Sequence, residues 1–249
     1  MTTPKKYSRR LLGGMLIAGG ITATAPSLLA QAATPPAGAG LYGSGALGSW
    51  TGLSQSVSTP QSIRAAVAND GVFGFGDSLG VFTFRDLAVR LAASGTVLAV
   101  NAKSGRPTAP TVDILSQWAS AYRLPRRIVM AVGSNDIFNP SVFSAQVNRV
   151  MTITGPTITV YWPEIHVSRW SQSTGVQVAD QRNSAWLNTQ LYAAAAKHPN
   201  LKIISWATFL AQKPAYQIGT YLTDGVHTTA AGTASRNSVL ASLIKVRVK

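Results

Sequence analysis

The sequence predicts an α/β fold: a flavodoxin-like three-layer αβα sandwich around a five-stranded parallel sheet. From Gly71 onward, short apolar runs alternate with longer segments of helical pattern. This alternation is typical of a parallel sheet that is covered by helices on both faces. The length of 249 residues and the hydrophobic content of 46% suit one good-sized core. In such folds, ligands bind at the C-terminal ends of the strands.

The N-terminal residues 1–32 are predicted to be a secretory signal peptide. Four basic residues precede the uncharged stretch 11–30, and Ala30-Gln31-Ala32 supplies the small residues of a cleavage site. Residues 8–12 also resemble a twin-arginine export signal. The glycines in the apolar stretch make it a poor permanent membrane span. We expect export across the bacterial cytoplasmic membrane, cleavage, and no stable membrane insertion afterwards.

Residues 33–66 are predicted to be a linker, and residues 67–249 the folded domain. The linker region is rich in Ala, Gly, Pro, Ser and Thr, which is typical of a spacer that crosses a cell-wall layer. Tyr42 and Trp50 are unusual for a pure spacer, so part of this region is expected to pack against the domain.

Each element of the domain is expected from its apolar pattern. The strands are expected at 72–76, 97–101, 128–133, 158–162 and 201–206. The helices are expected near 81–93, 110–122, 141–151, 180–197 and 229–246. Ser78, Gly105, Asn135 and the segment 162–170 then follow the first four strands in turn. All four should therefore open onto one rim of the sheet.

The charge of the chain predicts an anionic partner. Lys and Arg total 22 against 8 acidic residues, for a net charge of +14, and removal of the four basic residues within 1–32 would leave +10. Such an excess signals nucleic acid, a membrane surface or an acidic polymer. The basic residues are scattered without a basic-aromatic motif, so we expect an anionic cell-envelope polymer and no nucleic acid.

No metal or cofactor is expected. Cysteine is absent, and the three histidines show no i, i+4 pairing of the kind found in zinc helices. Gly74-x-Gly76 follows a strand, but the third glycine comes one residue late for a dinucleotide loop, and no acidic residue closes the next strand.

The catalytic candidates are Ser78, Asp224 and His227. Ser78 lies in Gly76-Asp77-Ser78-Leu79, between a strand and a helix, where the hydroxyl meets the positive end of the helix dipole. A nucleophilic serine needs a base that a third group orients. Asp224 can reach Nδ1 of His227 across a turn that contains Gly225, which leaves Nε2 for Ser78. The alternative for Ser78 is a simple helix cap.

Acyl transfer also needs hydrogen-bond donors where the oxyanion forms. The Asn135 side-chain amide follows the third strand, and Gly105 offers a backbone N–H that substrate can approach because no Cβ is present. The backbone N–H of Ser78 is the third candidate donor. Asp77 and Asp136 are interpreted as turn residues that bind local N–H groups.

Four sequence blocks resemble those of the SGNH (GDSL) hydrolases. They are Gly76-Asp77-Ser78-Leu79, Gly105, Gly133-x-Asn135-Asp136 and Asp224-x-x-His227, and the resemblance covers residues 70–247. That family has a flavodoxin-like fold and comprises esterases, lipases, carbohydrate acetylesterases and acyltransferases. The resemblance implies that Ser78 is the nucleophile, His227 the base and Asp224 its orienting group. It also places Gly105 and Asn135 in the oxyanion hole.

A narrower resemblance is to the SGNH domains of bacterial polysaccharide O-acyltransferases, in which an Arg and a Trp often follow the fourth strand, as Arg169 and Trp170 do here. We expect Arg106, Arg169 and Trp170 to contact substrate, and His166 to be either a substrate contact or an exposed residue. The predicted function is a monomeric, secreted serine esterase that acts on O-acyl esters, O-acetyl esters among them, of envelope glycans or small molecules. The alternatives are an O-acyltransferase and a non-catalytic basic module that binds the envelope.

Overall fold

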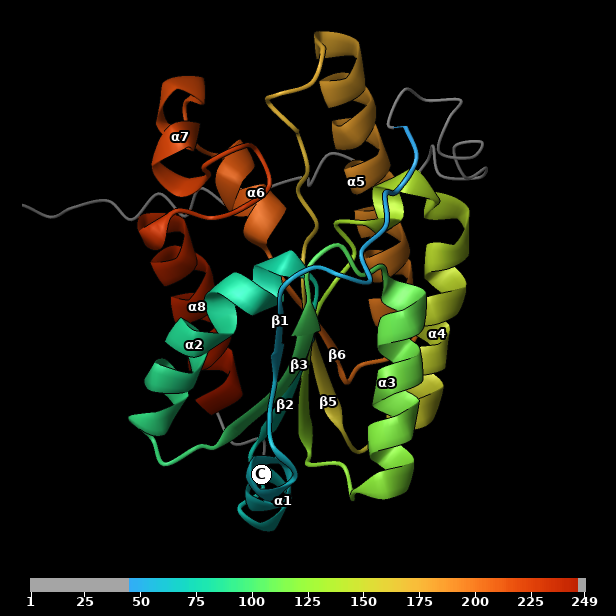
Figure 1. Cartoon of the computed structure of the whole chain (residues 1–249), viewed down its shortest axis with the longest axis vertical. Helices are drawn as coiled ribbons and strands as arrows, with labels where there is room; N and C mark the ends of the chain where they lie inside the picture. The colour runs from blue at the N-terminus through green and yellow to red at the C-terminus, as the bar shows by residue number, and fades with distance from the viewer. Residues whose placement is uncertain (1–44, 246–249) are drawn as a thin grey trace, which may run out of the picture. The chain divides into compact units, whose positions relative to one another are not determined.

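The structure, a computed structural model, describes residues 45–245 and centres on a six-stranded sheet (Figure 1). Its strand order is β1-β3-β2-β4-β5-β6. The strands are β1 (Gln55–Val57), β2 (Val72–Gly76), β3 (Leu98–Lys103), β4 (Arg127–Ala131), β5 (Thr159–Pro163) and β6 (Leu201–Ile204). Strands β2 to β6 are parallel, in the order that defines a flavodoxin-like winding. The predicted fold class is confirmed, and the predicted signal peptide lies outside the described residues.

Strand β1 corrects both the strand number and the domain boundary. It pairs antiparallel with β3, so that Gln55 lies opposite Lys103. It is followed by α1 (Pro60–Ala68), which Thr59 caps and whose Ile63 and Ala66 are buried in the core. The folded domain therefore begins within the predicted linker 33–66. A three-residue edge strand carries almost no periodicity, and a proline suits the first turn of a helix as well as a linker.

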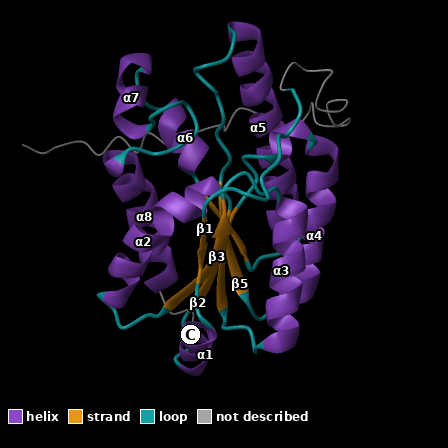
Figure 2. Cartoon of the chain, viewed as in Figure 1, coloured by secondary structure: helices purple, strands orange, loops and turns teal. Residues whose placement is uncertain are grey.

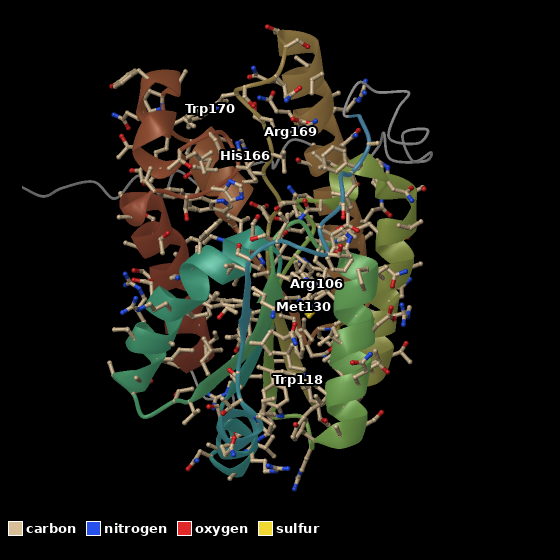
Figure 3. All side chains as sticks on the ribbon, in the orientation of Figure 1. Arg106, Trp118, Met130, His166, Arg169 and Trp170 are labelled. Carbon is tan, nitrogen blue, oxygen red and sulfur yellow. The ribbon has the colours of Figure 1, made fainter. Side chains whose placement is uncertain are left out.

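Helices cover both faces of the sheet, which confirms the three layers (Figure 2). One face carries α2 (Ser78–Ala92) and α8 (Ala230–Lys245), and the other carries α3 (Thr108–Ala121), α4 (Phe143–Thr154) and α5 (Thr174–Ala195). The residues of β2 alternate accordingly: Phe73 and Phe75 belong to the core cluster beneath α3, and Val72 to the cluster beneath α2 and α8. The Phe73 ring meets Trp118 edge-on at 4.9 Å, and Trp118 and Met130 lie between sheet and helix (Figure 3).

The connection from β6 to α8 was not predicted in detail. It contains α6 (Trp206–Ala211), a 3₁₀ turn (Ala215–Gln217) and α7 (Ile218–Tyr221). Trp206, Leu210 and Leu222 form a small core of their own. This connection delivers the chain to the turn that carries Asp224 and His227. Across residues 45–245, none of the helices has both the length and the apolar character needed to cross a membrane.

Candidate active site

The turn between β2 and α2 holds Ser78 at the start of a helix. Asp77 is the N-cap, and its Oδ1 accepts a hydrogen bond of 2.9 Å from the backbone N–H of Leu79. A Cβ on Gly76 would lie 2.7 Å from Cα of Gly80, so the strand can meet the helix this closely only with glycine. Ser78 is 8% exposed and is the first residue of α2, at the positive end of the helix dipole.

The structure brings the three predicted catalytic residues together. Nε2 of His227 lies 2.8 Å from Oγ of Ser78, and Nδ1 of His227 lies 2.7 Å from Oδ2 of Asp224. The two contacts use opposite nitrogens of one ring, as a serine, its base and the orienting carboxylate require. The ring edge of Phe82, which sequence reasoning did not single out, packs against His227 at 5.6 Å.

The turn that carries Asp224 and His227 is fixed from several sides. Oδ1 of Asp224 accepts the backbone N–H groups of Val226 (2.9 Å) and His227 (2.8 Å). Partial burial raises the pKa of Asp224, but the hydrogen bonds from the His227 side chain and from both backbone N–H groups outweigh it and leave the pKa below its usual value. Asp224 is therefore a carboxylate at neutral pH and can hold the imidazole in the tautomer with the proton on Nδ1.

Gly225 docks this turn onto the segment after β5. The backbone N–H of Ser168 donates to Gly225 O, and that of Trp170 donates to Asp224 O, both over 3.0 Å. Gly225 has φ = +87°, and a Cβ there would lie 1.8 Å from Ser168 O and 2.6 Å from Nε1 of Trp170. The turn can dock this closely only because residue 225 has no side chain, and this docking positions His227.

A pocket of about 240 Å³ lies in front of Ser78 and His227. Its polar wall includes Asn135 and Arg169. Its apolar wall is made by Ile137, Phe138, Val167 and Val226. A carbonyl carbon bound beside Ser78 can therefore have an apolar group on one side and hydrogen-bond donors on the other.

Two of the three predicted oxyanion donors, Asn135 and Gly105, differ in their surroundings. Asn135 lines the pocket, and within residues 45–245 its Nδ2 makes one long contact of 3.4 Å, to Arg106 O, which leaves it able to bind an oxyanion. Gly105 is not among the pocket-lining residues. Its φ is +74°, and a Cβ there would lie 2.8 Å from Cβ of Trp50. The glycine is therefore needed for packing against Trp50, and the role of its backbone N–H as an oxyanion donor stays a prediction.

Arg106 does not lie on the rim, and its predicted role as a substrate contact is wrong. It is 4% exposed, and its guanidinium donates to Oδ1 of Asn101 (2.8 Å), to Asn101 O (2.8 Å) and to Gly76 O (3.1 Å). It ties the end of β2 to β3 close to Ser78. Figure 3 shows it at the end of the sheet, below the segment with Arg169 and Trp170.

Arg169 lines the pocket, whereas Trp170 supports the catalytic turn. The Arg169 guanidinium binds the buried carboxylate of Asp180 over 2.8 and 2.9 Å, and it lies 4.8 Å above the ring of Phe138. Trp170 is partly exposed and packs over Gly225, outside the residues that line the pocket. His166 is half-buried and lies outside them too, and burial lowers its pKa.

The two acidic residues interpreted as turn formers are both deeply buried. Burial raises the pKa of Asp77, against the opposing effects of the Leu79 hydrogen bond and the charge of Arg236. Asp136 accepts the backbone N–H (2.9 Å) and the hydroxyl (2.7 Å) of Thr108, so it caps α3 from 28 residues away. Burial raises the pKa of Asp136 to about 7. Asp136 was predicted to bind N–H groups of its own turn, but it caps a helix that is distant in the sequence.

Comparisons with known proteins place this geometry in context. No family model and no curated protein matches the sequence. Solved structures do match. A lipase/acylhydrolase from Enterococcus faecalis is 18% identical over 72% of this chain and 97% of its own, with a TM-score of 0.59. A member of the lipolytic G-D-S-L family from Veillonella parvula is 21% identical over 72% and 99%, with a TM-score of 0.54.

A third match is the C-terminal catalytic domain of peptidoglycan O-acetyltransferase A from Streptococcus pneumoniae. It is 18% identical over 70% of this chain and 91% of its own, with a TM-score of 0.52. Identities this low establish the fold and leave the chemistry to the site. The chain has the fold of the SGNH (GDSL) hydrolases, as its four sequence blocks predicted.

Proposed function

We propose that this protein is a secreted serine esterase that hydrolyses O-acyl esters through an acyl-enzyme intermediate. The observation that carries the proposal is the continuous chain of contacts from Asp224 through His227 to Ser78, at 2.7 and 2.8 Å, at the wall of a pocket. A binding module has no need of such a chain, which weighs against the non-catalytic alternative. Export is supported by the signal pattern of residues 1–32.

The geometry supports the following mechanism. Oγ of Ser78 attacks the ester carbonyl carbon while its proton passes to Nε2 of His227. The oxyanion binds the backbone N–H of Ser78 and Nδ2 of Asn135, and the charge of Asp224 stabilises the imidazolium. His227 then protonates the leaving alkoxide, which departs as the alcohol. A water molecule, deprotonated by His227, then attacks the acyl carbon; the bond from that carbon to Oγ breaks, His227 returns the proton to Oγ of Ser78, and the carboxylic acid leaves.

The pocket favours a short acyl group. Its volume of about 240 Å³ is below the range of about 300–1,000 Å³ in which proteins bind drug-sized ligands. The pocket wall that contains Arg169 is held in place, because Arg169 forms an ion pair with Asp180 and packs on the ring of Phe138. An acetyl ester fits these limits better than a long-chain ester, and an anionic envelope glycan is the partner that the net charge of +14 suggests.

An O-acyltransferase remains the second candidate. Its acyl-enzyme is the same, and a sugar hydroxyl takes the place of water in the second step. It is favoured by one observation, the structural likeness to the catalytic domain of a peptidoglycan O-acetyltransferase. Acyl transfer to an added glycan in preference to water would select this candidate.

The test is an ester panel from acetyl to long acyl, assayed with the wild type, Ser78→Ala and Ser171→Ala. Ser171 also lines the pocket but does not contact His227, so it is a matched control for loss of a hydroxyl. We expect Ser78→Ala to lose several orders of magnitude in turnover and Ser171→Ala to lose little. A sulfonyl fluoride probe should label Ser78, as mass spectrometry of peptides will show. Labelling elsewhere, or an active Ser78→Ala protein, would refute the proposal.

A further inference from the structure

Phe82 is an exposed aromatic residue that lies against the catalytic histidine. It is 60% exposed, and its ring meets that of His227 edge-on, with the ring centroids 5.6 Å apart. It lies one turn after Ser78 on α2, so the two side chains share a face of the helix. Helical side chains lean toward the N-terminal end of their helix, which brings the Phe82 ring back over the first turn. Phe82 is not among the residues that line the catalytic pocket.

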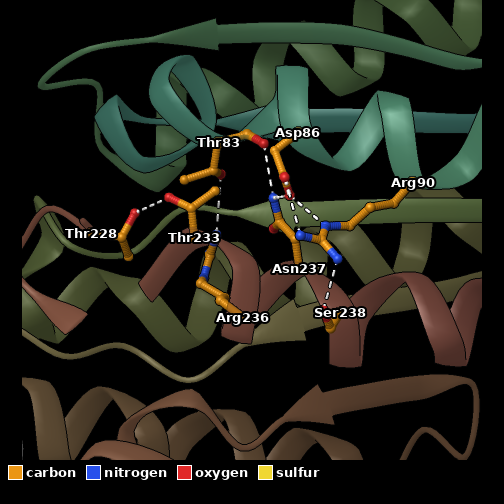
Figure 4. A network of polar contacts seen from close by, with 8 residues as sticks. All are labelled: Thr83, Asp86, Arg90, Thr228, Thr233, Arg236, Asn237 and Ser238. Atoms are coloured by element: carbon orange, nitrogen blue, oxygen red, sulfur yellow. Dashed lines mark hydrogen bonds and ion pairs between the residues drawn. The ribbon is translucent and has the colours of Figure 1, made fainter. Parts of the chain in front are cut away.

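The backbone that carries Phe82 is held in place from the opposite side of α2 (Figure 4). Nδ2 of Asn237, on α8, donates to Thr83 O (2.9 Å) and to Oδ2 of Asp86 (3.0 Å). Asp86 is also paired with Arg90 at 2.6 Å. Thr83 is fully buried, whereas Phe82, the residue before it, is turned to solvent. The helix therefore presents the Phe82 ring on a fixed backbone, and a ligand would not have to order it.

The geometry of catalysis decides which part of the ester meets this ring. His227 gives its proton to the leaving oxygen, so that oxygen must lie within about 3 Å of Nε2. In the mechanism proposed above, the acyl group occupies the pocket, and the alcohol part extends from the leaving oxygen in another direction. Phe82 contacts the ring of His227 and lies outside that pocket. The alcohol part of the ester can therefore rest on Phe82.

An open phenyl face suits a sugar ring better than an alkyl chain. The face of an aromatic ring carries partial negative charge and attracts polarised C–H groups, which a pyranose presents on one face while its hydroxyls stay hydrated. A long alkyl chain would need a continuous apolar groove. Arg85, one turn further along the same face of α2, is exposed and charged, so the apolar surface does not continue in that direction.

We propose that Phe82 determines the specificity for the alcohol part of the ester, and that this part is a sugar ring stacked on the phenyl face. The inference rests on the proposed esterase function and names the alcohol part of its substrate. Phe82 is a substrate contact in this reading, and its packing against His227 places that contact beside the leaving oxygen.

The test compares three acetate esters that differ in their alcohol: ethyl acetate, hexyl acetate and methyl 6-O-acetylglucopyranoside. Each kcat/KM is divided by that for ethyl acetate, so that a general effect of residue 82 on His227 cancels. In Phe82→Ala the ratio for the glucoside should fall about threefold to tenfold, mainly through KM, and the ratio for hexyl acetate should change by less than about twofold. Phe82→Trp should keep or raise the glucoside ratio. Val89→Ala is the matched control, because Val89 is exposed on the same face of α2, two turns from Phe82.

A binding experiment separates this inference from the esterase function. Ser78→Ala protein cannot form an acyl-enzyme, and saturation-transfer NMR on it should show transfer from aromatic protons to the ring protons of the acetylated glucoside. The transfer should vanish when Phe82→Ala is added and persist when Val89→Ala is added.

An unchanged glucoside ratio in Phe82→Ala, an equal fall for hexyl acetate, or transfer that survives the loss of Phe82 would each overturn the inference and leave the esterase function standing. If the wild type hydrolyses none of the three esters, the esterase function fails, and the NMR result alone decides the role of Phe82.

Discussion

Replacement of Gly225 by alanine should disable the catalytic histidine without any change to a catalytic side chain. The new Cβ would lie 1.8 Å from Ser168 O, so the turn must move by more than 1 Å to reach ordinary contact distance. That movement breaks the two backbone hydrogen bonds that dock the turn, at about 0.5–1.5 kcal/mol each. The backbone at φ = +87° adds about 1–2 kcal/mol for a residue with a Cβ.

Together these effects should destabilise the fold by about 2–5 kcal/mol, and they should cost more in catalysis than in stability. Asp224 and His227 flank Gly225, and a displacement of about 1 Å in a catalytic group typically costs about a hundredfold in rate. The assays are kcat/KM for a small acetyl ester and the free energy of unfolding from urea titration. Both can be measured on the same preparation.

Gly95→Ala is the matched control, because Gly95 has φ = +69° with no atom within 4 Å of the added Cβ. It should show the backbone strain alone and keep full activity. Wild-type kcat/KM in Gly225→Ala would show that Ser168 does not fix the turn. An equal loss of activity in both variants would mean that the loss arises from strain in general.

Three further predictions concern the rest of the site. Asn135→Ala should lower kcat on the order of a hundredfold to a thousandfold with little change in KM, since Asn135 lines the pocket and its Nδ2 makes a single long contact within the described part of the chain. An effect confined to KM would rule out an oxyanion role. The pKa of Asp136 is raised by burial to about 7, so the folded state holds a proton that the unfolded state releases near pH 4. This contribution to stability is complete below about pH 4 and is lost as the pH rises to about 7, by roughly 4 kcal/mol at most. Urea titrations from pH 4 to 8 should show that the free energy of unfolding falls with pH in the wild type and changes less in Asp136→Asn. If the free energy fell equally in both proteins, groups other than Asp136 would be responsible for the pH dependence. Finally, the apparent affinity for an anionic envelope polymer should fall steeply with salt, while the turnover of a neutral ester should not. If salt lowered both quantities equally, the basic charge of the protein would have no part in the choice of substrate.

The sequence predicted the elements whose signal is local. The parallel strands are apolar runs, Ser78 closely follows one of them, and Asp224 and His227 share one short turn between α7 and α8. Asn135 was found in the same way, because it directly follows an apolar strand. The positions of Ser78 and Asn135 followed from the alternation of strands and helices and the rule that ligands bind at the C-terminal edge. Asp224 and His227 followed from their spacing and from the need of a nucleophilic serine for an oriented base.

What could not be predicted depends on contacts between distant segments. Arg106 was expected on the rim because it follows a strand, but its partners Gly76 and Asn101 draw it beneath the nucleophile. Asp136 caps a helix that begins 28 residues earlier in the chain. Arg236 lies on a helix whose sequence shows no clear apolar face, so nothing local marks it as buried. In each case tertiary packing decides the side chain's surroundings.

The antiparallel direction of β1 determines where the N-terminal segment leaves the domain. Gln55 lies opposite Lys103, the last residue of β3, and Ser54 and Trp50 continue past Ser104 and Gly105. The chain that precedes β1 therefore departs from the same edge of the sheet that carries Ser78. A parallel first strand would have placed this exit at the opposite edge.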